Sequence, residues 1–208
     1  MTEDQVFKGL EAADGASLKA CRETEGLVLL TRDDLFFPAY YSSSAGRSTT
    51  TPESVWGRDS FERYFQAVSN VWSRGEWLDE DSPHTRWMFQ IPHTFISELF
   101  PGGNGRPEIK FQNGKIAEIY FGGKSFSGWN FRQAVCLRHG WASMKSLECG
   151  IEVGAGGAWV LNGSGLGHGV GVSVYGSASL ADKGLDFKEI LAFYFPKLKS
   201  LVGENRSD

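Results

Sequence analysis

The pattern of apolar and polar positions predicts short helices and strands along the whole chain. Apolar residues at helical spacing predict helices over residues 5–24, 61–68, 92–100, 128–137, 172–183 and 187–194. Alternating or β-branched runs predict strands over residues 26–31, 36–41, 86–91, 109–111, 116–121 and 158–161. The strands outnumber what a repeating βαβ order would give. We therefore expect an α+β fold with largely antiparallel strands and several short helices, in one domain or in two small lobes around a groove.

Turn-forming residues support these boundaries at two places. Asn113-Gly114 separates the runs 109–111 and 116–121, and this dipeptide is a strong signal for a tight β-hairpin. Pro196 follows the last predicted helix, and the residue before a proline disfavours helical geometry. The hairpin is accordingly the clearest element in the sequence.

The composition indicates a folded protein without bulk affinity for nucleic acid. The chain has 208 residues, of which 41% are apolar and 13% aromatic, so it can bury a core. The formal net charge of −4 argues against a nucleic-acid partner. The chain as given shows no signal peptide, and its longest apolar runs are too short for a transmembrane segment. Three cysteines without a C-x-x-C pair are expected to be free thiols.

Five of the 26 glycines alternate between Gly163 and Gly171, directly before a predicted helix. The tract lacks the lysine of a phosphate-binding loop, and Val170 stands where a dinucleotide-binding fingerprint needs its third glycine. Around Ser173 the spacing also differs from that of a hydrolase nucleophile elbow. The four histidines are scattered, so we predict no metal site and no cofactor.

Alternating glycines bring exposed backbone N–H groups close to whatever binds there. We therefore expect the Gly163–Gly171 loop to line a cleft, with His168 standing among residues that have no side chain. A buried structural histidine is the alternative. Ser173 either contacts a substrate or caps the helix that follows. Trp56 and Trp87 are expected to pack in the core.

Four motifs occur in an order that resembles one bacterial family. They are AYYSSSAGRS at residues 39–48 with VWG at 55–57, SPHTRW at 82–87, the FR…LR helix at 131–138, and GSGLGHGVGVS at 163–173 with its continuation to 196. Together they resemble the stage II sporulation protein D family, also called the amidase-enhancer or SpoIID/LytB domain. The resemblance covers residues 16–197 and so treats the chain as a single domain of this type.

The resemblance implies a protein of the bacterial cell envelope or extracellular space that acts on peptidoglycan glycan strands. Some members of the family are lytic transglycosylases, and others stimulate a cell-wall amidase. The motif positions imply a substrate-binding set that consists of Tyr41, Ser43, Ser44, Arg47, Gly167, His168, Gly169 and Ser173.

The family's catalytic glutamate lies in an E-M-P element that has no match in this chain, so the catalytic residue is unknown. Three explanations stay open. The chain is a piece of a longer protein whose preceding part carries the acid, or it is a domain that binds glycan or an amidase without cutting. Alternatively a different acid takes over, with Glu53 and Asp59 beside the serine-rich loop as candidates.

Overall fold

The computed structural model describes residues 14–57, 59–198 and 202–203. Its helices are α1 (Gly15–Glu23), α2 (Pro52–Trp56), α3 (His93–Leu99), α4 (Gly128–His139), α5 (Val174–Asp182) and α6 (Phe187–Tyr194). Short 3₁₀ turns lie at Glu62–Tyr64, Ser73–Gly75 and Ala155–Gly157. Its strands are β1 (Leu27–Val28), β2 (Tyr41–Ser42), β3 (Trp87–Ile91), β4 (Glu108–Gln112), β5 (Lys115–Phe121), β6 (Lys124–Ser127), β7 (Cys149–Val153), β8 (Trp159–Gly163), β9 (Val172–Ser173) and β10 (Val202–Gly203). The fold is α+β, as the sequence pattern predicts.

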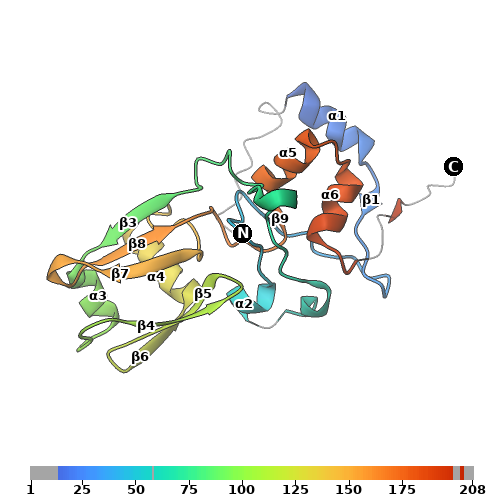
Figure 1. Cartoon of the computed structure of the whole chain (residues 1–208). Helices are drawn as coiled ribbons and strands as arrows, with labels where there is room; N and C mark the ends of the chain where they lie inside the picture. Colours follow the sequence, from blue (N-terminus) through green and yellow to red (C-terminus); the bar gives the residue numbers. More distant parts are fainter. Residues whose placement is uncertain (1–13, 58, 199–201, 204–208) are drawn as a thin grey trace.

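Two antiparallel three-stranded sheets, in the orders β3-β8-β7 and β4-β5-β6, form one side of the molecule together with α3 and α4. The helices α1, α5 and α6 lie on the other side (Figure 1). Trp159 on β8 is fully buried between the sheets, and its ring centroid lies 5.6 Å from that of Phe100 and 5.2 Å from that of Phe121. Burial of such large rings supplies much of the apolar area that stabilises this side.

The β4–β5 hairpin forms where the sequence predicts it. Asn113 and Gly114 have φ angles of 51° and 74°, the left-handed pair that a two-residue turn between twisted strands requires. A register shift lies before the turn, between Lys110 and Phe111, and the Phe111 side chain is exposed. The tip of this hairpin forms one wall of a surface groove.

Two very short parallel strands bring distant parts of the sequence together. On β2 and β9, Tyr41 pairs with Val172, while Ser42 pairs with Ser173. Farther along, Ser44 and Leu166 exchange backbone hydrogen bonds of 3.1 and 2.9 Å. The serine-rich loop after residue 41 and the glycine-rich loop before residue 173 therefore lie side by side.

Several predicted elements differ from the structure. The helix predicted over 61–68 is wrong: only Glu62–Tyr64 forms a 3₁₀ turn, because Phe65 is extended and its ring packs 4.7 Å from that of Phe37. The predicted strands 26–31 and 36–41 contact each other only through an isolated bridge between Leu30 and Phe36. Within the first of them, β1 pairs with β10. Strands β6 and β7 were not predicted, since they are short and polar or glycine-containing. Residues 5–13 of the first predicted helix lie outside the described residues.

Candidate functional site

The eight residues that the sequence nominates lie in one region but differ in exposure. Tyr41 and Arg47 are exposed, and Ser43 is half-buried. The others are buried, namely Ser44, Gly167, His168, Gly169 and Ser173. The two loops thus lie side by side. Of the six nominated residues that carry a side chain, three are buried rather than exposed to an open cleft, namely Ser44, His168 and Ser173.

Asp79, which no sequence pattern singled out, is fully buried where the two loops meet. Its Oδ2 accepts hydrogen bonds from the Ser44 hydroxyl at 2.6 Å and from the Gly46 N–H at 3.2 Å. Its Oδ1 accepts from the Ser173 hydroxyl at 2.7 Å. A buried carboxylate needs such donors, so the two serines act as its partners and tie the loops together. Ser173 also caps α5 by accepting from the Gly176 N–H at 3.4 Å.

A second buried polar pair supports the same loop. Asn70 donates from Nδ2 to the Gly46 carbonyl at 2.8 Å and accepts from the Tyr194 hydroxyl at 2.8 Å. Burial raises the pKa of Tyr194, and the nearby charge of Asp79 adds to this shift. The Tyr194 hydroxyl therefore stays protonated and acts as a donor that links α6 to the loop.

His168 belongs to this buried layer, since only 7% of its surface is exposed. Its Nδ1 accepts from the Val170 N–H at 3.0 Å. Its ring centroid lies 5.0 Å from that of Trp56 and 6.5 Å from that of Tyr40. The expectation that this imidazole stands in an open loop is wrong, because the flanking glycines let the backbone turn inward and aromatic rings cover it. Trp56, expected in the core, instead keeps 37% of its surface exposed.

A second carboxylate, Glu148, lies directly before β7 and is also saturated with donors. Its Oε1 accepts from the Ser164 hydroxyl at 2.6 Å and from the Arg47 N–H at 3.0 Å. Its Oε2 accepts from the same N–H at 3.1 Å and from Lys115 Nζ at 3.1 Å. Lys115 also donates to the Ala45 carbonyl at 2.9 Å. Burial lowers the pKa of Lys115, and the charge of Glu148 offsets part of that effect.

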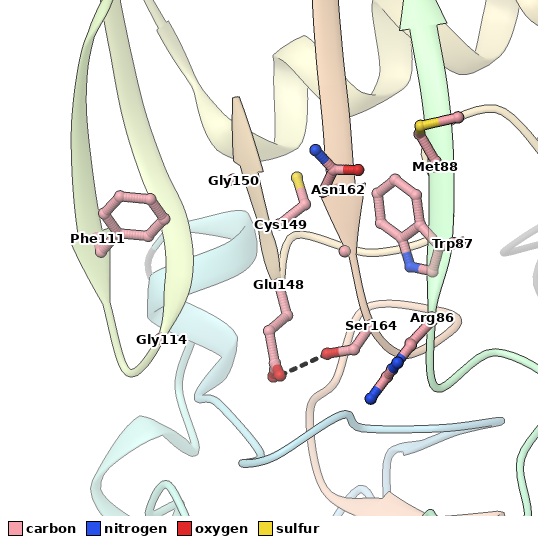
Figure 2. A pocket seen from close by; sticks show the side chains of 11 residues that line it. Arg86, Trp87, Met88, Phe111, Gly114, Glu148, Cys149, Gly150, Asn162 and Ser164 are labelled. Carbon is pink, nitrogen blue, oxygen red and sulfur yellow. Dashed lines mark hydrogen bonds between the residues drawn. The ribbon is translucent and has the colours of Figure 1, made fainter. Parts of the chain in front are cut away.

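An open groove of about 700 Å³ lies beside Glu148, between the hairpin tip and the ends of β3, β7 and β8. We term it the strand-end groove. It is lined by Arg86, Trp87, Met88, Phe111, Gly114, Glu148, Cys149, Gly150, Asn162, Gly163 and Ser164. Figure 2 shows Phe111 and Gly114 on the hairpin at one side and Met88, Trp87 and Arg86 at the other. The Glu148–Ser164 hydrogen bond lies at the same end as Arg86 (Figure 2).

Trp87 contributes an unusual donor to the strand-end groove. Its side chain is buried as predicted, with 8% exposed, yet its Nε1–H is buried without a hydrogen-bond partner among the described residues. A Cβ on Gly163 would collide with the Trp87 ring, so the glycine allows the indole to lie across β8. A buried N–H without a partner is costly, and a ligand that accepts from it removes that cost.

Glu148 is the one carboxylate among the described residues that line the groove. Its two oxygens together accept hydrogen bonds from the Lys115 ammonium, the Ser164 hydroxyl and the Arg47 N–H, so neither oxygen is free to deliver a proton to a substrate. The two acids considered from the sequence lie elsewhere. Glu53 is exposed on α2, and Asp59 accepts from the Phe61 N–H at 2.7 Å; neither lines the groove.

Across residues 14–57, 59–198 and 202–203, no group of three or more His, Cys, Asp or Glu side chains is arranged to hold a metal ion. None of the helices described there is both long enough and apolar enough to cross a membrane.

Neither the scan against family models nor the search of curated proteins finds a match for this chain. Membership of the sporulation protein D family therefore stays a prediction that depends on the motifs quoted above. Sequence reasoning missed Asp79 and Glu148, which lie outside any contiguous motif, and it noted Asn162 only as part of the short Asn162-Gly-Ser pattern. The one available signal was Gly163, whose missing side chain leaves room for the Trp87 ring in the groove wall.

Proposed function

We propose that this protein binds the glycan strands of peptidoglycan in the strand-end groove without cutting them. The observation that carries the proposal is the unpartnered Trp87 Nε1–H, buried in the wall of an open groove that also presents Asn162 and Ser164. Sugar hydroxyls and acetamido carbonyls accept hydrogen bonds from such donors. The exposed side chains of Met88 and Phe111 offer apolar surface to the C–H faces of the rings.

The choice of binding over cleavage follows from the carboxylates. Transglycosylation needs a carboxylic acid that protonates the glycosidic oxygen within hydrogen-bond reach. The carboxylate of the groove, Glu148, is held by Lys115, Ser164 and a backbone N–H. The resemblance to the sporulation protein D family supports peptidoglycan as the source of the glycan. Binding to it implies action in the cell envelope or outside the cell.

Filling the groove tests the proposal. Gly150 is exposed on β7, lines the groove, and has open space where a side chain would extend. Gly150→Trp should weaken binding to purified glycan strands ~10-fold or more, because the indole occupies the volume that the ligand needs. Gln90→Trp is the matched control, since Gln90 is exposed on β3, lies outside the groove, and has the same charge as glycine. Binding is measured by fluorescence titration and by co-sedimentation with cell-wall sacculi.

Three results would contradict the proposal. Equal binding by the wild-type protein, Gly150→Trp and Gln90→Trp would place the glycan elsewhere. Release of anhydromuramic ends from the strands would show cleavage. The third is that the protein does not bind strands but raises the turnover of a cell-wall amidase, and that Gly150→Trp raises it equally. This result would favour the amidase-enhancing role instead.

A further inference from the structure

A second, polar cavity shares one lining residue, Arg86, with the strand-end groove. Arg86 comes directly before β3 and lines both the groove and this cavity, which has a volume of about 390 Å³. Arg47 contributes to the second cavity as well, beside Trp77 and Thr85. Arg86 lies at the end of the groove where Glu148 and Ser164 lie (Figure 2), and it shares the second cavity with Arg47.

Arg47 is held in position from both ends. Its backbone N–H donates to both oxygens of Glu148, at 3.0 and 3.1 Å. Its guanidinium carbon lies 4.7 Å from the ring centroid of Trp77, and Trp77 Nε1 donates to the Gly46 carbonyl at 2.9 Å. Stacking uses the face of the guanidinium and leaves its N–H edges available for a ligand. A side chain ordered in advance loses less conformational entropy on binding.

Neither the Arg47 nor the Arg86 guanidinium forms an ion pair with a carboxylate of the described residues. Two carboxylates share the cavity, Glu76 and Glu80. Glu76 pairs with Lys183 at 2.8 Å, and Glu148 nearby pairs with Lys115 at 3.1 Å. Glu80 is exposed and is the only cavity carboxylate of the described part without an ion pair. The cavity therefore holds two unpaired cations against one unpaired anion.

We infer that Arg47 and Arg86 form a subsite for a carboxylate carried by the glycan; this rests on the proposed function. The planar N–H fork of arginine matches a carboxylate and binds it through paired hydrogen bonds. Peptidoglycan offers that group from two sources, the lactyl ether of muramic acid and the stem peptide. The groove then binds the sugar rings, while the subsite selects strands that carry an acidic group.

The test compares three ligands by isothermal titration. They are neutral N-acetylglucosamine oligomers, strands with free lactyl carboxylates after removal of the stem peptides, and strands that retain their stem peptides. The variants are Arg47→Gln, Arg86→Gln and the double variant. Arg22→Gln is the charge-matched control, because Arg22 is exposed on α1 and lines neither cavity. Urea unfolding verifies that each variant is folded.

We expect the wild-type protein to bind an acidic strand ~10-fold more tightly than the neutral oligomer, with each single substitution reducing this preference ~3-fold or more. The double variant should lose the preference and keep its affinity for the neutral oligomer, while Arg22→Gln behaves as wild type. The acidic strand that binds more tightly identifies the source of the carboxylate.

Equal affinity of the wild-type protein for neutral and acidic strands would overturn the subsite while leaving groove binding intact. A preference that survives in the double variant would do the same. Failure to bind any of the three ligands would instead contradict the proposed function.

Discussion

Removal of the Asp79 carboxylate should destabilise the protein strongly, because it is the common acceptor of two loops. In Asp79→Ala, the hydroxyls of Ser44 and Ser173 and the N–H of Gly46 lose an acceptor in a fully buried site. An unsatisfied buried donor costs about 1–3 kcal/mol. The removed desolvation cost of the carboxylate offsets part of the sum, so we expect a net loss of about 3 kcal/mol in the free energy of unfolding.

The size of the effect should follow the number of donors left without an acceptor. Asp79→Asn keeps the shape and one oxygen, so it should cost about 1–2 kcal/mol. In the double variant Asp79→Ala with Ser44→Ala, one orphaned donor disappears together with its acceptor. Its cost should therefore fall below the sum of the two single variants by about 1 kcal/mol.

Urea unfolding followed by tryptophan fluorescence measures these differences, since the chain has seven tryptophans. Asp81→Ala is the control, because Asp81 is exposed two residues farther along, and its change should stay within about 0.5 kcal/mol. A loss below about 1 kcal/mol for Asp79→Ala would refute the reasoning, since it would mean that the donors find other acceptors. Additive costs in the double variant would refute the direct coupling of Asp79 with Ser44.

Two further predictions concern buried titratable groups. Burial lowers the pKa of Lys115 below its ordinary value of 10.5. Between the lowered pKa and 10.5 the unfolded chain binds more protons than the folded protein, so the free energy of unfolding, compared with that of Lys115→Met, should rise as the pH increases toward 10.5. A difference between the two proteins that stays constant with pH in denaturant titrations would contradict this. Burial raises the pKa of Cys149 to about 12, with Glu148 adding to the shift, so this thiol should resist alkylation in the native protein. Mass spectrometry after iodoacetamide treatment should find the exposed Cys21 modified and Cys149 protected until urea is added, whereas modification of Cys149 at the rate of Cys21 would refute its burial.

Elements with strong local signals could be predicted from the sequence. The Asn113-Gly114 hairpin, β3 after residue 86, and the helix at 187–194 form close to their predicted bounds. The hairpin and the helix are stabilised at short range, through a left-handed turn and through the capping box of Asp186 and Glu189. Strand β3 has a strong local pattern as well, although its partner is the distant strand β8. The 61–68 segment has a helical pattern as well, but its aromatic rings reach distant partners in an extended backbone, and tertiary packing prevails over the pattern.

The candidate site could be predicted only in part, because its members come from separate segments. The serine-rich and glycine-rich loops were nominated together, and the structure brings them together through β2 and β9. The serines of these loops face inward because they donate to Asp79. Asp79 lies in a run of acidic residues that looks like an ordinary exposed loop, so the sequence does not reveal its burial. The groove depends on Trp87, Asn162 and Glu148, which meet only once β3, β8 and β7 align.

By itself, the sequence determined the α+β composition of the fold and its clearest hairpin and helices, while the two loops were nominated by the resemblance to the sporulation protein D family. Only the tertiary structure decided that Ser44, His168 and Ser173 are buried and that the open groove lies beside Glu148. The physical reason is that hairpins and helix caps depend on neighbours within a few residues. The burial of a side chain, and whether a buried donor finds an acceptor, depend on residues that pack against it from distant parts of the chain.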